Sequence, residues 1–374
     1  MKSIRVGSFS VMMAALITLL SAVGCAPEAA PTTPNTPTTP SAPITPTTPS
    51  QPTTTPIEWV GSMSVGEGTL PYEHMKETGK VLEQVTGGRL KWVPYPAGAI
   101  VPATGCFDGV NDGVLDYSID PSAFWTDRVG YVSGLLCYVT GLTTPMDMLM
   151  WWDAGGWELA RRAVEGYPNM YLSKSPGQCR TAETFLWTNE PINSVADVKA
   201  MTIRSVGDSG VFLQEMGVAT LPIPPGEIYE SMQRGILDGF ELGSPAIDVT
   251  YTTWEMAKYA WIGDRQPAEH EMFFINRDSW NALTPELQAL VEQVVYARAV
   301  QYNTAARIAD LEAMALFESK GVIVQRIPSD VEAALKQAAN AVYDRRAADD
   351  AFYAEVLSSI RDTCARYRET WPRL

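Results

Sequence analysis

Residues 109–121 read GVNDGVLDYSIDP, and residues 234–245 read RGILDGFELGSP. In each stretch a helical segment is followed by Gly-(Val/Ile)-Leu-Asp and then by a short strand that runs into a proline-containing loop. Glycine is the residue expected where a helix stops. Two copies of this unit predict two similar lobes, with coincidence as the alternative because the shared motif is short. Ligands bind beyond the carboxyl ends of strands in open α/β sheets, so both loops are expected to face one cleft.

Around these units the chain alternates short β-rich runs with amphipathic helical stretches, which is the pattern of an α/β fold. A helix is predicted over Tyr72–Thr86, where Gly87-Gly88 stops it. The predicted strands are residues 58–63, 90–95, 116–119, 170–173, 184–188, 202–205, 239–241 and 272–275.

A very long helix is predicted over residues 284–320. Thr284 suits the N-cap, Pro285 suits the first helical position, and no glycine or proline follows before Gly321. A straight helix of this length spans about 50 Å, which is more than the width of one lobe. It is therefore expected to bridge both lobes, with a kinked pair of helices as the alternative.

The first 56 residues are expected to lie outside the fold. Residues 1–25 have a basic start, an apolar run too short to span a bilayer, and small residues before Cys25, which indicates a lipoprotein signal peptide lipidated at Cys25. Ordinary cleavage with an incidental cysteine is the alternative. Residues 26–56 form a Pro/Thr-rich tract that is expected to be a disordered tether between the membrane and the folded part.

Composition excludes several classes of function. A net charge of −15 is unsuited to nucleic acid, although one buried arginine can still bind a small anion. With His74 and His270 as the only histidines, and without a Gly-x-Ser-x-Gly, P-loop or GxGxxG motif, the sequence does not favour an enzyme, although a two-carboxylate hydrolase stays open. On a strand, alternation would place Glu269 and Glu271 together and His270 opposite.

The cysteines beyond Cys25 permit either disulfides or buried thiols. They form no CxxC motif and no cluster with histidine, so a zinc site is not indicated. Four cysteines allow three pairings, and the sequence does not choose among them. These cysteines are Cys106, Cys137, Cys179 and Cys364.

Six stretches in the same order resemble the substrate-binding proteins of TRAP (tripartite ATP-independent periplasmic) transporters, the DctP-like family. Each stretch is weakly specific alone, but their order is specific. The similarity covers essentially all of residues 57–340. The stretches are Thr86–Leu90 with Pro96–Gly98, Val110–Asp116, Pro191–Lys199, Met201–Arg204, Ile228–Gly239 and Ile275–Pro285.

The resemblance implies two α/β lobes with hinge strands and a long helix that braces both. Lobe 1 would be residues 57–181 with part of 270–320, and lobe 2 would be 182–268 with part of 321–374. It also implies a protein outside the cytoplasmic membrane that is not an enzyme. Such a protein delivers a small organic carboxylate to TRAP membrane subunits and requires no cofactor. A receptor lobe for a signalling partner is the main alternative.

Arg204 is the first candidate for the ligand site. It ends a predicted strand, and a guanidinium there can bind a carboxylate through two parallel hydrogen bonds. The residues alone leave a surface arginine paired with Asp208 as an equal alternative. The resemblance favours the ligand-binding role, because the family's arginine occupies this position of its motif.

Two carboxylates are further candidates. Glu241 follows the second repeat unit, where relatives keep a glutamate, but Leu242 replaces the asparagine or tryptophan usual at the next position. Glu183 falls near a glutamine that helps to bind a metal ion in the 2-oxo-acid branch of the family. A Na⁺ or Ca²⁺ ion bridging Glu183, Glu241 and the ligand would fit, since hard cations prefer oxygen. The ligand favoured on this basis is a 2-oxo or 2-hydroxy acid, with an ammonium-bearing ligand or a structural Glu183 as alternatives.

Aromatic residues are expected to form walls of the pocket, because ligand pockets are mostly apolar with a few placed polar groups. The candidates close to the family motifs are Trp125, Trp187, Tyr229 and Tyr72. The alternative for each of them is ordinary packing in an α/β core.

Overall fold

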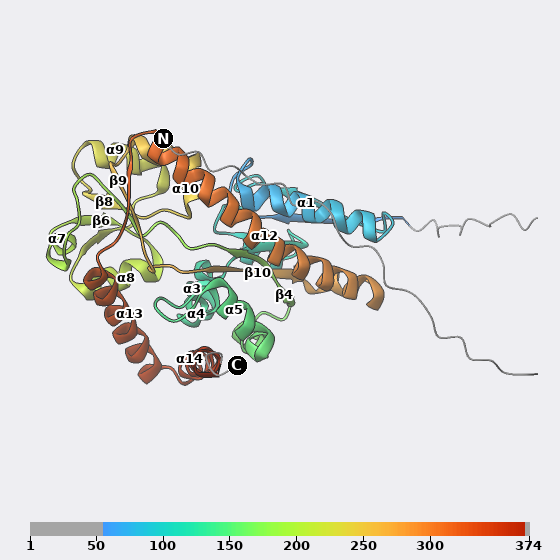
Figure 1. Ribbon diagram of the computed structural model, residues 1–374. Helices are drawn as coiled ribbons and strands as arrows, with labels where there is room; N and C mark the ends of the chain where they lie inside the picture. Colours follow the sequence, from blue (N-terminus) through green and yellow to red (C-terminus); the bar gives the residue numbers. More distant parts are fainter. Residues whose placement is uncertain (1–54, 371–374) are drawn as a thin grey trace, which may run out of the picture. The chain divides into compact units, whose positions relative to one another are not determined.

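The computed structural model describes residues 55–370 and is drawn in Figure 1. The predicted signal peptide, the lipidation site at Cys25 and nearly all of the Pro/Thr-rich tether lie outside the described residues. The described part contains two β-sheets with helices around them.

The first sheet has the strand order β2-β1-β3-β10-β4 and forms lobe 1. β1 is parallel to β2 and β3, whereas β10 is antiparallel to both β3 and β4. The strands are β1 (Ile57–Ser62), β2 (Leu90–Tyr95), β3 (Tyr117–Pro121), β4 (Met170–Arg180) and β10 (Glu269–Asn276).

The second sheet has the order β11-β9-β5-β8-β6-β7 and forms lobe 2. With two such sheets, the predicted two-lobed α/β fold is confirmed. The strands are β5 (Leu186–Thr188), β6 (Thr202–Arg204), β7 (Ala219–Leu221), β8 (Gly239–Phe240), β9 (Tyr259–Ile262) and β11 (Ile323–Arg326).

The two sequence repeats occupy equivalent places in the two sheets. In lobe 1 Asp116 follows Gly113, whose φ is 75°, and its Oδ2 accepts the Val60 N–H of β1 at 2.7 Å. In lobe 2 Asp238 follows Gly235, whose φ is 67°, and its Oδ2 accepts the Thr202 N–H of β6 at 2.7 Å. Positive φ explains both glycines. Each aspartate joins its unit to the neighbouring parallel strand, which explains why Gly-x-Leu-Asp occurs twice.

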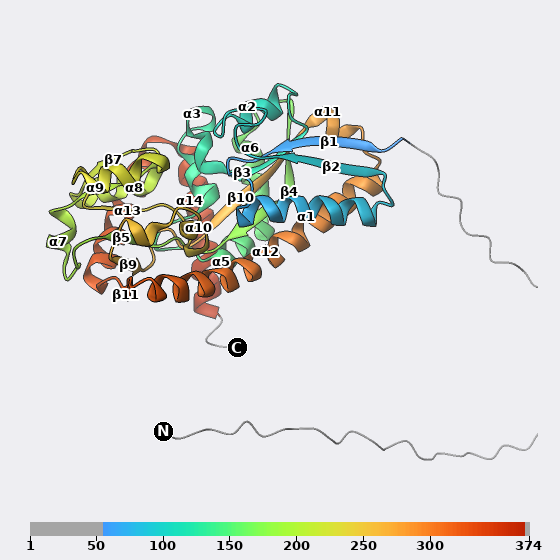
Figure 2. The same cartoon turned by 90° about the horizontal axis from the view of Figure 1, so that it is seen from above.

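Helix α12 crosses the view in Figure 1 and runs along the lower side of the folded part in Figure 2, with α1 packed against it. α12 (Pro285–Ser319) is one uninterrupted helix of 35 residues, which begins after the Thr284 cap. It packs against β4 and α1 (Leu70–Val85) of lobe 1 and against α10 (Pro245–Thr250) and β11 of lobe 2. It therefore bridges both lobes.

The C-terminal helices connect the lobes a second time. α13 (Ser329–Asp349) packs on α8 (Gly207–Met216) of lobe 2, and α14 (Ala351–Thr370) packs on α4 (Val132–Cys137) and α5 (Pro145–Trp151) of lobe 1. The remaining α-helices are α2 (Cys106–Asn111), α3 (Thr126–Val129), α6 (Trp157–Ala163), α7 (Val195–Lys199), α9 (Ile228–Gln233) and α11 (Arg277–Asn281).

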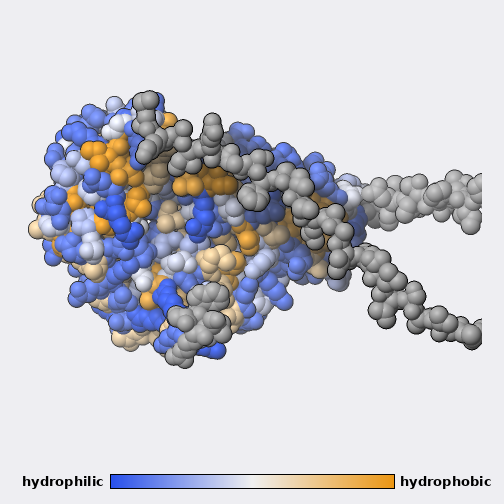
Figure 3. Space-filling model, in the orientation of Figure 1, coloured by the Kyte–Doolittle hydropathy of each residue, from blue (hydrophilic) through white to orange (hydrophobic). Residues whose placement is uncertain are grey.

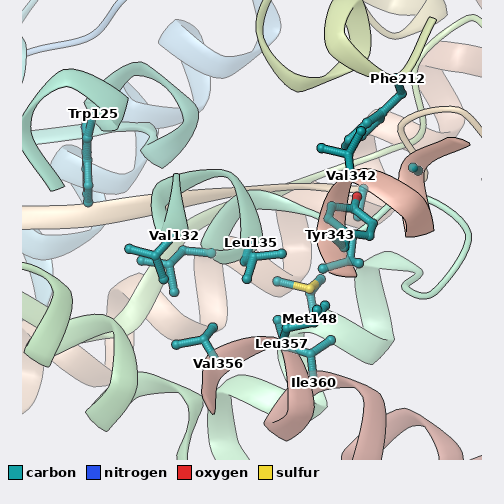
Figure 4. Packing of buried hydrophobic residues seen from close by; sticks show 14 of the residues in the cluster. Trp125, Val132, Leu135, Met148, Phe212, Val342, Tyr343, Val356, Leu357 and Ile360 are labelled. Carbon is teal, nitrogen blue, oxygen red and sulfur yellow. The ribbon is translucent and has the colours of Figure 1, made fainter. Parts of the chain in front are cut away.

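One hydrophobic core is shared by the two lobes. Figure 4 shows part of it, where Phe212 of α8 and Tyr343 of α13 lie near residues of α4, α5 and α14. Phe212 and Tyr343 meet edge to face, with ring centroids 5.1 Å apart. Burial of such large apolar side chains holds the lobes together on this side.

Within the described part of the chain the cysteines form no disulfide bond. No helix among residues 55–370 is long and apolar enough to cross a bilayer. Figure 3 shows a mostly hydrophilic face with smaller hydrophobic areas. The four cysteines left open by the sequence are free, buried thiols, and burial raises the pKa of the Cys364 thiol to about 11.

Gly61 of β1 offers a sharp test of core packing. A Cβ atom at Gly61 would lie 2.2 Å from the ring of Tyr117, which is fully buried against Trp92. Gly61→Ala is expected to lower the free energy of unfolding by about 3 kcal/mol, because overpacking displaces this ring. Urea unfolding of the variant measures the loss. Gly66→Ala is the matched control, because nothing lies within 4 Å of its Cβ, and it should change stability by less than about 1 kcal/mol. Equal stability of both variants would contradict the packing.

Candidate functional site

Two segments cross side by side between the lobes, and both carry charged residues. Residues 181–185 run from β4 to β5, and residues 263–268 run from β9 to β10. The Glu183 N–H donates to the Gln266 carbonyl at 3.0 Å. The Glu183 carboxylate accepts from Arg265 Nη2 at 2.5 Å and from Gln266 Nε2 at 3.0 Å. The candidate residue Glu183 therefore lies at the hinge between the two lobes.

Arg265 is the centre of this arrangement and is 0% exposed. Its Nη1 donates to Ser209 Oγ at 2.8 Å, and its Nε donates to the Phe185 carbonyl at 3.0 Å. Its Nη2 contacts Glu183 Oε2 and also lies 3.4 Å from Glu241 Oε2. Arg265 thus brings the two predicted carboxylates together at one nitrogen of its guanidinium, Nη2.

Arg204 lies on the other side of Glu241. Its Nη1 donates to the Glu241 carbonyl at 2.7 Å and its Nε donates to the Ile223 carbonyl at 2.8 Å, while Oε1 of Glu241 is 3.7 Å from Nη1. Arg204 is 4% exposed, and among residues 55–370 no hydrogen-bond partner is found for its Nη2. Asp208 pairs with Arg346 of α13 instead of Arg204. The Nη2 group of this buried guanidinium is therefore available to donate to another acceptor.

The electrostatics of Glu183 follow from its position. Burial raises the pKa of the Glu183 carboxyl to about 8, while the Arg265 guanidinium acts in the opposite direction and Glu241 adds to the rise. A carboxyl in this environment takes up a proton near neutral pH far more readily than an exposed one.

A second buried charged group flanks the first. Arg180, at the end of β4, contacts Glu269 at 2.8 Å and also pairs with Glu271 of β10. His270 points the other way, with its Nε2 3.2 Å from the Cys179 thiol, as strand alternation predicts. Burial lowers the pKa of His270 to about 4. Among residues 55–370 no group of three or more His, Cys, Asp or Glu side chains is arranged to hold a metal ion.

Trp187 is part of a hydrophobic core in lobe 2. It is fully buried, stacks on Phe240, and meets Phe317 of α12 edge to face at 4.9 Å. Its indole N–H donates to Asp248 Oδ2 at 2.8 Å. Burial raises the pKa of Asp248 to about 7. Trp187 therefore packs against Phe240 and against Phe317 of α12.

The other aromatic candidates lie apart from one another. Trp125 is 1% exposed and lines a small recess of about 170 Å³ together with Asp120. Tyr72, on α1, is buried and donates its hydroxyl to the Pro94 carbonyl at 3.1 Å. Tyr229, on α9, is 48% exposed. The structure therefore brings Arg204, Glu241 and Glu183 together, but not these aromatic residues.

Arg265 is the central residue that sequence reasoning missed. It lies in the stretch Gly263-Asp264-Arg265-Gln266-Pro267, directly after the buried strand β9. A cation in a turn after a strand is a signal that could have been used, because loops at strand ends form ligand sites in α/β sheets. Its pairing with Glu183, 82 residues earlier in the chain, is visible only in the fold.

A family model and several curated proteins match part of this chain. The family model of the bacterial extracellular solute-binding proteins, family 7, named DctP, matches residues 181–350. The monocarboxylate 2-oxoacid-binding periplasmic protein all3028 of Nostoc is 26% identical over 212 residues, which is 56% of this chain and 57% of that protein. An uncharacterized protein of Salmonella typhimurium, YiiZ, is 26% identical over 165 residues, 44% of this chain and 49% of that protein. The chain matches about half the length of these curated relatives.

Solved structures show the same fold. A TRAP periplasmic solute-binding protein from Colwellia psychrerythraea, with bound calcium and pyruvate, has a TM-score of 0.78 at 24% identity, covering 84% of this chain and 96% of that one. One from Pseudoalteromonas atlantica, with bound sodium and pyruvate, has a TM-score of 0.76 at 22% identity, covering 84% and 96%. The described part of the chain therefore has the two-lobed fold of these structures. Together with the family-model match over residues 181–350 and the similarity to the Nostoc protein, this fold confirms the resemblance to DctP-like proteins read from the sequence.

Proposed function

We propose that this protein captures a small organic carboxylate between its two lobes and delivers it to the membrane subunits of a TRAP-type transporter. The observation that carries the proposal is the buried guanidinium of Arg204. Its Nε and Nη1 donate to protein carbonyls, and its Nη2 is available to donate to another acceptor. A desolvated guanidinium gives both affinity and orientation to a carboxylate.

The relatives support the same ligand class. The Nostoc relative is named for monocarboxylate 2-oxoacids, and two similar structures contain pyruvate. We therefore favour a 2-oxo or 2-hydroxy acid as the ligand. Glu241 belongs to the site through its carbonyl and carboxylate, which contact Arg204 and Arg265. We assign no catalytic residue, since the proposed role is to bind and release the ligand unchanged.

The location follows from the family, whose solved members are described as periplasmic. We propose that the folded part is held at the outer face of the cytoplasmic membrane by a lipid on Cys25, with residues 26–56 as the tether. Metabolic labelling with a radioactive fatty acid should mark the wild-type chain and should not mark Cys25→Ser.

Native mass spectrometry of the purified protein tests the binding function. We expect the folded chain to carry added mass equal to one small organic acid, and we expect this mass to disappear after denaturation. Calorimetry with pyruvate, lactate and malonate should then show one site per chain in the protein stripped of ligand. A chain that carries no added mass and binds none of these acids would contradict the proposed function.

A further inference from the structure

Similar solved structures contain calcium or sodium together with the bound organic acid. In this chain the two candidate metal ligands, the carboxylates of Glu183 and Glu241, already have partners within the protein. Glu183 Oε1 accepts from Gln266 at 3.0 Å, and its Oε2 accepts from Arg265 at 2.5 Å. Glu241 Oε1 accepts the Val206 N–H at 3.0 Å, and its Oε2 lies 3.4 Å from Arg265 Nη2. Each of the four oxygens therefore has a protein partner.

A metal ion fits poorly between these carboxylates. It would have to take the place of the Arg265 Nη2 group, which is fully buried and fixed through its neighbouring nitrogens by Ser209 and Phe185. A cation beside that group would be repelled by its charge.

We propose that the Arg265 guanidinium supplies, within the chain, the positive charge that calcium or sodium supplies in those structures. This inference rests on the proposed carboxylate-binding function. Arg265 acts as a positioning residue: it holds Glu241 by the carboxylate, and Glu241 in turn accepts from Arg204 through its carbonyl. Ligand binding by this chain is then independent of metal ions.

Calorimetry of the wild-type protein with pyruvate tests the proposal without any substitution. One titration uses sodium-free buffer with a chelator, and the others contain added calcium or sodium. The dissociation constant should agree among them within about twofold. An affinity at least about tenfold weaker without ions, restored by calcium, would overturn the role of Arg265 while leaving the carboxylate function intact. If neither pyruvate nor other small carboxylates bind with any ion present, the proposed function itself fails.

Calcium binding to the ligand-free protein gives a readout that does not depend on pyruvate. We expect no saturable calcium site in the wild type. Arg265→Gln should create one, because it removes the charge that Glu183 Oε2 and Glu241 Oε2 share, and pyruvate binding should then require calcium. Arg326→Gln is the matched control, because Arg326 is an exposed arginine paired with Glu332. Circular dichroism checks that both variants fold.

Two results would count against the inference in this second experiment. One is a calcium site in the wild-type protein that Glu241→Gln removes. The other is pyruvate binding by folded Arg265→Gln that matches the wild type without any ion. If Arg265→Gln does not fold, Arg265→Lys keeps the charge in place, and its pyruvate binding should stay insensitive to the chelator.

Discussion

Arg204→Ala is expected to weaken carboxylate binding by about a hundredfold or more. Removal of one partner of a buried, charge-assisted pair typically costs 2–5 kcal/mol, and each 1.4 kcal/mol is about tenfold in affinity. Arg204 is 4% exposed, so water cannot fully replace the hydrogen bonds that its guanidinium donates to the ligand. Calorimetry with the ligand identified by mass spectrometry measures the loss.

The fold of this variant should survive. The substitution removes the hydrogen bonds to the carbonyls of Ile223 and Glu241, at a cost of about 1 kcal/mol for each bond. Arg204→Lys keeps the charge but loses the planar fork, and we expect an intermediate affinity from it. Unchanged affinity in a folded Arg204→Ala protein would remove Arg204 from the site.

Trp187→Ala is expected to produce the largest loss of stability. The side chain is fully buried between Phe240 and Phe317, and replacing a buried tryptophan by alanine costs about 3–5 kcal/mol. It also takes from Asp248 the indole N–H that donates at 2.8 Å. Denaturant unfolding followed by circular dichroism gives the difference in free energy.

Trp187→Phe separates packing from ligand contact. It keeps an aromatic ring but loses the hydrogen bond to Asp248, so we expect a loss of about 1–3 kcal/mol. If this variant were as stable as the wild type but no longer bound its ligand, the predicted pocket-wall role of Trp187 would gain support instead.

The outline of the fold could be predicted from the sequence because it depends on local signals and on motif order. The expected helix over 284–320 is found at Pro285–Ser319, where the cap, the first-turn proline and the final glycine mark its ends. Strand β4 shows the limit of such signals. The sequence predicts it over 170–173, but the strand continues to Arg180. The added part contains Pro176 and Gly177 and is held by its pairing with β10, which includes register shifts.

The candidate site could be predicted only in part. Arg204 and Glu241 belong to sequence motifs, whereas Glu183 is proposed only from its position near a family glutamine, and the fold places the three close together. Arg265 belongs to no motif, and its role depends on two segments that meet only after both lobes have formed. The tryptophans show another limit of the sequence: the same side chain suits a pocket wall and a core, and only the neighbouring residues decide between them.

The position of β10 has a consequence for how the molecule folds. β10 lies between β3 and β4 in the sheet of lobe 1, yet it follows the whole sheet of lobe 2 except β11 in the chain. The sheet of lobe 1 therefore cannot be completed until most of the chain has been synthesised. Neither half can be excised as an autonomous folding unit, and both should melt in a single cooperative transition.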